Sequence, residues 1–155
     1  MNTDFEKALI NLDSNKRYDL CSVVKDYIVN DRPISDLISK LDIYHIPFTA
    51  YTNFTLYRGI ATSVNYIDYI CAEHSGAFTS NYKIAESFAI RNIDEEEDLT
   101  VALVLEIKEP ECISIRDLVY ALNIDDQYCN DVVEEEDEYI VKSFGPSKAS
   151  YVIIN

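Results

Sequence analysis

The stretch LTVALVLEIK, residues 99–108, carries the clearest structural pattern in the chain. Every second residue in it is a larger apolar one, and two residues is the period at which side chains alternate across a β-strand. These residues are Leu99, Val101, Leu103, Leu105 and Ile107. Pro110 follows closely, and proline ends a strand because it has no N–H to donate to the ladder. The pattern therefore predicts one long strand that stops before Pro110.

Shorter stretches on both sides of this strand also combine β-branched and aromatic residues, which favour strands. They are Phe54–Ile60, Gly76–Ser80 (a strand or a turn), Cys112–Ile115, Glu138–Val141 and Ser150–Ile154. We expect an acidic turn at 94–98 before the long strand. We also expect a loop rich in Asp and Asn between residues 115 and 138.

Helical spacing marks other parts of the chain. Two apolar stripes in the first fifty residues predict a pair of packed helices, the second with Pro33 in its first turn. The stripes are Leu20, Val23, Val24, Tyr27 and Ile28, then Ile34, Leu37, Ile38 and Leu41. Later, Thr62 is placed to cap a short helix, and another helix should follow Ser80. The first would carry Val64, Ile67 and Cys71, and the second would bury Ile84, Ala85, Phe88 and Ala89.

Helices that come first and strands that dominate later predict an α+β fold. A chain of 155 residues suggests a single domain, here with a helical N-terminal part at 1–50 and a core at 51–155. At 48% hydrophobic residues, the chain can build a real core.

Composition narrows the classes of function. A formal net charge of −15 repels phosphate backbones, so we expect no direct nucleic-acid binding. We expect no metal site, because no Cys or His cluster exists, and the scattered cysteines should be reduced and mostly core residues. They are Cys21, Cys71, Cys112 and Cys129. No stretch reaches the roughly 18 apolar residues of a membrane span, and no secretory signal is evident, so we expect a cytoplasmic protein with no membrane partner.

Three pieces of the sequence carry candidate chemistry. The first is Arg58 in LYRGI, because its guanidinium offers a planar fork to a phosphate or carboxylate. Gly59 beside it lets a ligand approach the backbone closely. The second is GAFTSNYKIAESFA, residues 76–89, where the hydroxyls of Thr79 and Ser80 can hold a carboxylate or cap a helix.

The third piece is the acidic run EEEDEYIV, residues 134–141. Residues two apart on a strand point to the same side, so Glu136 and Glu138 would place two carboxylates in one cleft. Such a pair can divide its roles, one stabilising a cation and the other managing a proton. Glu95 and Glu97 have the same spacing, and acidic runs are commonly solvated turns.

In this order, the pieces resemble the arginine–serine–glutamate class of mono-ADP-ribosyltransferases, most of all the small bacteriophage enzymes that modify host proteins. The resemblance covers residues 54–155. LYRGI is similar to the arginine strand of the family, FTSNYKIAESFA to its serine motif and helix, and EDEYIV to its glutamate strand. VALVLEIKEP and SYVII are similar to the strands between and after them.

The family order also selects among the candidates. Glu95 and Glu97 come too soon after the serine helix, so Glu136 and Glu138 match better. The family's serine motif commonly reads Ser-Thr-Ser, whereas this chain reads AFTS at residues 77–80, and both Thr79 and Ser80 remain candidates for the functional hydroxyl.

The resemblance implies an ADP-ribosyltransferase-like split β-sandwich around an NAD cleft, with NAD as a substrate. Glu138, held by Ser80 or Thr79, would stabilise the sugar cation, and Glu136 would bind and deprotonate an acceptor arginine. Arg58 would clamp the pyrophosphate and the Gly59 backbone the nicotinamide amide. The implied catalytic set is Glu138, Glu136, Arg58 and Ser80, and the NAD-binding set is Arg58, Gly59, Thr79, Ser80, Phe88 and Glu138.

The implied partner is a target protein with an exposed arginine on a basic surface, contacted by the loop at 123–133 with Tyr128. For a phage enzyme, the compartment would be the host bacterial cytoplasm. Three alternatives stay open: an acidic DNA mimic or inhibitory binding protein without catalysis, an NAD glycohydrolase toxin, and an inactive fold used for binding.

Overall fold

The long strand predicted by the alternating stretch is β4 (Val101–Lys108), which begins at Val101 rather than Leu99. The computed structural model describes residues 3–70, 76–142 and 149–155. In it, β4 lies between β2 (Thr55–Thr62) and β7 (Ala149–Ile153) and is antiparallel to both. β2 and β4 pair along their whole length, from Thr55 opposite Lys108 to Thr62 opposite Val101. This is a longer pairing than that between β2 and β3 (Gly76–Thr79).

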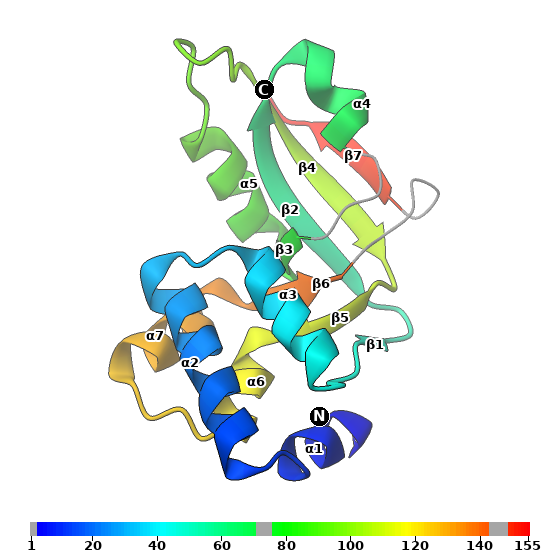
Figure 1. Ribbon diagram of the computed structural model, residues 1–155. Helices are drawn as coiled ribbons and strands as arrows, with labels where there is room; N and C mark the ends of the chain where they lie inside the picture. The colour runs from blue at the N-terminus through cyan, green and yellow to red at the C-terminus, as the bar shows by residue number, and fades with distance from the viewer. Residues whose placement is uncertain (1–2, 71–75, 143–148) are drawn as a thin grey trace.

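Side chains on both faces of β4 are buried. Helix α5 (Tyr82–Arg91) packs against β2 and β4 from one side (Figure 1). On the other side, the sheet curls, and Leu103 and Leu105 join a core cluster with Phe78 and Val141 from distant strands. Helix α5 covers one face of β4 and the curled sheet covers the other, so the middle of β4 is apolar on both faces.

The strands of the described residues form one antiparallel sheet in the order β1-β5-β6-β3-β2-β4-β7. The strands not yet given are β1 (Thr49–Ala50), β5 (Glu111–Ser114) and β6 (Glu138–Val141). Between the fully described strands β2 and β3, the pairing is a single pair, Tyr57 opposite Thr79. The sheet thus has two halves with a narrow join, and it is curled, as Figure 1 shows.

Helices gather at the β5–β6 half of the sheet and cover it (Figure 1). They bury one continuous apolar cluster, which includes Leu20, Val24, Leu37 and Leu118 together with Ile140 of β6. The helices are α1 (Thr3–Ile10), α2 (Ser14–Asn30), α3 (Ile34–Ile43), α6 (Ile115–Ala121) and α7 (Gln127–Glu136). The pair predicted in the first fifty residues is confirmed as α2 and α3, although Pro33 is the cap of α3 rather than a residue of its first turn. The mixed α and β class is also confirmed.

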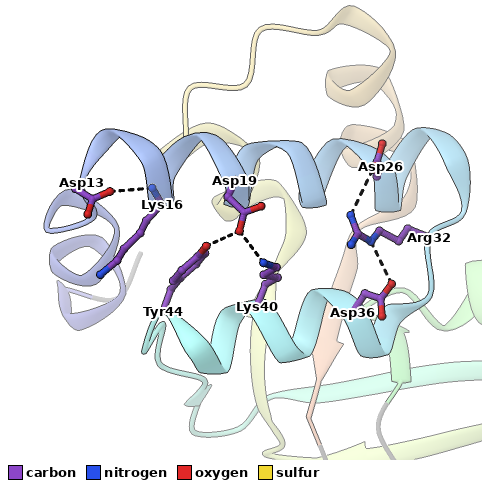
Figure 2. Close-up of polar contacts among 8 residues, drawn as sticks. All are labelled: Asp13, Lys16, Asp19, Asp26, Arg32, Asp36, Lys40 and Tyr44. Carbon is purple, nitrogen blue, oxygen red and sulfur yellow. Dashed lines mark hydrogen bonds and ion pairs between the residues drawn. The ribbon is translucent and has the colours of Figure 1, made fainter.

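Polar contacts fix α2 against α3 at their outer surface. Figure 2 shows the two helices running in opposite directions, with Asp19 of α2 accepting from Lys40 of α3 and from Tyr44, the residue that caps the end of α3. Near the corner between the helices, the guanidinium of Arg32 contacts Asp26 at 3.4 Å and Asp36 at 3.1 Å. These exposed pairs add little stability individually, but they hold the α2–α3 corner in one geometry.

The prediction of a loop between residues 115 and 138 was wrong, because most of this segment is helical and forms α6 and α7. The polar residues there cap helices. The Oγ of Ser114 accepts from the N–H of Asp117, and Oδ1 of Asp126 accepts from the N–H of Cys129. Side chains of Ser, Asp and Asn satisfy the free N–H groups of a first helical turn, so this composition marked helix ends.

The helix expected from Thr62 is also different. Thr62 ends β2, and Ser63 precedes a short 3-10 turn, η1 (Val64–Tyr66), which leads into α4 (Ile67–Ile70). Ile67 is buried, but Val64 is exposed. Cys71 lies outside the described residues, whereas Cys112 and Cys129 are free and buried, and Cys21 is free and half-buried.

No helix within residues 3–70, 76–142 and 149–155 is both long and apolar enough to cross a membrane.

Candidate active site

One cleft of about 270 Å³ collects most of the residues singled out by sequence. Its lining comes from β2, β3, α5, the end of α7 and the start of β6. It includes Arg58, Gly59, Thr79, Phe88, Glu136 and Glu138. Ser80 is the one member of the predicted set that is not part of this lining. Side chains from β2 and β6 therefore converge on this cleft, although roughly eighty residues separate the two strands in the sequence.

The register of the sheet explains this convergence. Tyr57 of β2 pairs with Thr79 of β3, and Thr79 pairs with Glu138 of β6. Residues directly opposite one another in antiparallel strands have neighbouring side chains on one face. The narrow join between the two halves of the sheet thus sets Glu138 close to the strand that carries Arg58.

The two glutamates reach the cleft by a route that the sequence pattern did not predict. Glu136 is the last residue of α7, and Glu138 is the first residue of β6, so they are not two apart on one strand. Asp137 between them has a φ of 48°, in the left-handed region. A helix often ends on a residue of this conformation, and Asp tolerates it better than most residues. The expectation of strand alternation was wrong, although both carboxylates line the cleft.

The Ser80 hydroxyl contacts Asp137 and not Glu138. Arg116 of α6 also donates to Asp137, at 3.2 Å. Ser80 therefore anchors the turn that separates the two glutamates. The Thr79 Oγ1 accepts from the N–H of Asn81 at 3.1 Å, and among the described residues no side-chain hydrogen bond joins Thr79 to the Glu138 carboxylate. The cap of α5 is Asn81, so the alternative left open by the sequence, that Ser80 caps this helix, was wrong.

Glu138 is held instead by Tyr27, which belongs to α2 in the helical N-terminal part of the chain. The Tyr27 hydroxyl donates to Oε1 of Glu138 at 3.1 Å. Burial raises the pKa of Glu138 to about 7, a change that the nearby Glu136 reinforces and the hydrogen bond from Tyr27 opposes. Burial, together with Glu138, also raises the pKa of Tyr27, so its hydroxyl stays a donor. The result is a carboxyl group that changes charge near neutral pH.

Arg58 lies in a pocket that a glycine keeps open. A Cβ added at Gly76 would lie 2.5 Å from Nη1 of Arg58. Any residue larger than glycine would therefore displace the guanidinium. The guanidinium also lies over the ring of Phe78, 6.0 Å from its centroid. Burial lowers the pKa of Arg58, and proximity to Tyr27 opposes that shift. The side chain is therefore positioned by β3 from one side of the cleft.

Helix packing requires glycine at position 59. A Cβ at this position would lie 1.8 Å from the backbone oxygen of Ala85 and 2.8 Å from the backbone nitrogen of Ala89. Helix α5 thus lies directly against β2, with small residues at the contact. Helix α5 fills the space on the Cβ side of Gly59, and the contact of the Gly59 backbone with a ligand stays a prediction, since Gly59 also lines the cleft.

Two residues of α5 give the cleft its outer wall. Phe88 was expected to be buried, but 49% of its surface is exposed, and it lines the cleft. Arg91 also lines it and lies 5.6 Å from the centroid of the Phe88 ring. Arg91 opposes the upward shift that burial imposes on the pKa of Glu136. The cleft therefore presents a cation and an aromatic ring on one wall and carboxylates on the other.

Sequence reasoning missed Tyr27 and Arg91. Tyr27 was assigned to the apolar stripe of α2, where its hydroxyl carried no signal. Arg91 lies three positions after Phe88 and thus on the same face of α5, a spacing that could have revealed it. Within the described residues, no group of three or more His, Cys, Asp or Glu side chains is arranged to hold a metal ion.

Comparisons of the chain with protein-family models, with curated proteins and with solved structures found no match.

Proposed function

We propose that this cleft binds NAD and that the protein transfers ADP-ribose from NAD to an arginine of a target protein. The observation that carries the proposal is that Arg58, Glu136 and Glu138, from three separate elements, line one cleft. The same three residues match the arginine strand and the glutamate pair of the family that the sequence resembles.

The chemical character of the cleft suits NAD. Arg58 and Arg91 offer two guanidinium groups to a diphosphate, whose oxygens match the fork of guanidinium N–H donors. Phe88 offers an exposed aromatic face to a planar ring. A volume of about 270 Å³ is close to the lower end for small-molecule sites, so part of the dinucleotide would extend out of the cleft.

Glu138 would act on the bond between nicotinamide and ribose. When that bond breaks, its electron pair leaves with nicotinamide, and positive charge develops on the sugar. A fixed carboxylate in a partly dry site stabilises this charge more in the transition state than in the ground state. The Tyr27 hydroxyl would fix the direction of the carboxylate, and Ser80 would fix the turn that precedes it through Asp137.

Glu136 would serve the acceptor. A guanidinium is protonated at neutral pH and is a poor nucleophile in that form. The carboxylate of Glu136 would orient it, and would take one proton as the guanidinium nitrogen bonds to the sugar carbon. The products would be nicotinamide and an ADP-ribosylated arginine. A net charge of −15 favours a target arginine on a basic surface.

The curled sheet also supports the proposal. Its two halves meet at the pair Tyr57–Thr79, and the cleft lies at this join. A split β-sandwich around an NAD cleft, which we propose for this chain, places its substrate site between two half-sheets in the same manner.

The proposal is tested with purified protein, NAD and agmatine, a small molecule that carries the guanidinium of arginine. We expect nicotinamide release together with ADP-ribosyl-agmatine, both separated by chromatography. Glu136→Gln should reduce agmatine modification at least about a hundredfold, because the base for the acceptor is lost, and should leave nicotinamide release measurable. Nicotinamide and free ADP-ribose without modified agmatine would instead identify an NAD glycohydrolase. No nicotinamide release under any condition would refute the proposal.

Tyr27→Phe should move the pH dependence of NAD cleavage. The ionised form of Glu138 is the one that stabilises a cation, so kcat/KM of the natural protein should rise with pH through about 7. The hydrogen bond from Tyr27 lowers this pKa, and its loss should shift the midpoint to higher pH. Tyr18→Phe is the matched control, since Tyr18 is exposed on the same helix. A midpoint that is identical in natural protein and Tyr27→Phe would show that Tyr27 does not tune Glu138.

A further inference from the structure

A second cavity, of about 360 Å³, adjoins the active-site cleft. Glu136 and Glu138 line both spaces, so the two carboxylates form the wall between them. The rest of the second cavity comes from α6 and α7 and from the corner between α2 and α3, which lies outside the part of the chain that the resemblance covers. These residues are Tyr27, Ile28, Asp31, Arg32, Pro33 and Ile34 at the α2–α3 corner, and Ile115, Tyr128, Val132 and Val133 at α6 and α7.

The charge of this cavity is negative. Among the described residues, Arg32 is the one cation in its lining, and its guanidinium is shared between the carboxylates of Asp26 and Asp36 (Figure 2). Within the described part of the chain, no hydrogen bond or ion pair engages the side chain of Asp31 or of Glu136. Asp31 also lies close enough to raise the pKa of Glu136. Asp31 and Glu136 are therefore open to a cation from outside the chain, and Arg91, which lines the neighbouring cleft, offsets only part of the negative charge at Glu136.

The remaining walls suit a long side chain with a flat end. Tyr128 is 58% exposed and lines the cavity from α7. Val132, one turn later, and Ile28 and Pro33 on the opposite wall offer apolar surface. A guanidinium stacks on an aromatic face, and the methylene groups of an arginine pack on aliphatic ones.

We propose that this second cavity receives the side chain of the acceptor arginine, with Asp31 and Glu136 beside the guanidinium and Tyr128 against it. The assignment rests on the proposed function, and it makes the N-terminal helices a substrate-recognition element. The acceptor would enter from the helical side, and NAD would occupy the cleft on the other side of Glu136 and Glu138. Arginine selectivity would then depend on the α2–α3 corner as well as on the glutamate pair.

The test compares Asp31→Asn and Tyr128→Ala with Asp131→Asn, an equal change of charge at an exposed residue of α7 outside the cavity. Asp31→Asn and Tyr128→Ala should each raise the KM for agmatine about fivefold to tenfold, since each removes one charged or aromatic contact. The KM for NAD and the rate of nicotinamide release without agmatine should stay unchanged, and Asp131→Asn should change none of these values. A raised KM for NAD would place part of NAD in this cavity and overturn the assignment, as would an unchanged KM for agmatine.

A binding measurement separates this inference from the proposed function. Agmatine is titrated into the protein without NAD, and NMR follows the tyrosine side chains. The assignment predicts a saturable shift at Tyr128 that weakens in Asp31→Asn and persists in Asp131→Asn. If this holds in a protein that never cleaves NAD, the proposed function is wrong and the guanidinium site stands. If NAD is cleaved but agmatine shifts neither Tyr128 nor Tyr27, with or without NAD, the guanidinium site is wrong.

Discussion

Glu138→Gln should reduce nicotinamide release from NAD about a thousandfold, the upper range for losing one preorganised electrostatic contact to a developing charge. Glutamine keeps the shape of the side chain and can still accept from Tyr27, so the loss would report charge rather than structure. Steady-state kinetics at pH 8, where the carboxylate is ionised, provide the measurement. Glu135→Gln is the control, because Glu135 is exposed on α7 and lines neither cavity.

Stability gives a second readout of the same substitution. The folded protein holds the pKa of Glu138 at about 7, above its ordinary value of 4.5. The unfolded state therefore ionises first, and Glu138 favours the folded state at low pH and loses that contribution as pH rises through 7. Relative to Glu138→Gln, the natural protein should thus lose free energy of unfolding between about pH 4.5 and 7. Full activity of Glu138→Gln would show that Glu138 is not the catalytic carboxylate. A stability difference that does not vary with pH would show that the folded protein does not raise the pKa of Glu138.

Gly59→Ala should lower the free energy of unfolding by about 3 kcal/mol or more, at the upper end for an overpacked contact. The added methyl group would meet the backbone of α5 at Ala85 and Ala89, which cannot move without displacing the helix from β2. Thermal unfolding should show a Tm that falls by about 6–12 °C.

Gly76→Ala is the matched comparison, because its added methyl group meets the flexible end of the Arg58 side chain instead. This variant should keep most of its stability and lose affinity for NAD. If Gly59→Ala retained its Tm and lost only NAD affinity, Gly59 would serve ligand approach rather than helix packing.

The strands could be predicted because their residues show the strand pattern locally, with alternating apolar residues or a high content of β-branched and aromatic residues. β6 lies at the predicted residues 138–141, and β4 was shortened by only its first residues. The region between residues 115 and 138 was not predictable in this way. Asp126 and Ser114 cap helices, yet the same residue types are common in loops. Only the burial of Leu118 and Cys129 in a core built by distant helices selects the helical state.

The site residues that lie within a single motif could be predicted from the sequence. The contacts between residues of different elements could not. Arg58, Thr79 and Glu138 were found by their local sequence, and the sheet register brings the last two together. The partner of Glu138 comes from α2, more than a hundred positions earlier. A hydrogen bond between helix and strand at such separation leaves no pattern in either segment. The same holds for Ser80, whose contact with Asp137 depends on the left-handed turn after α7.

Mass spectrometry of a bacterial lysate incubated with this protein and NAD tests the central claim most directly. The natural protein should add ADP-ribosyl groups to arginines of one or a few lysate proteins, and Glu138→Gln should add none under the same conditions. A lysate in which no arginine gains the group while NAD stays intact would contradict the claim that this cleft transfers ADP-ribose.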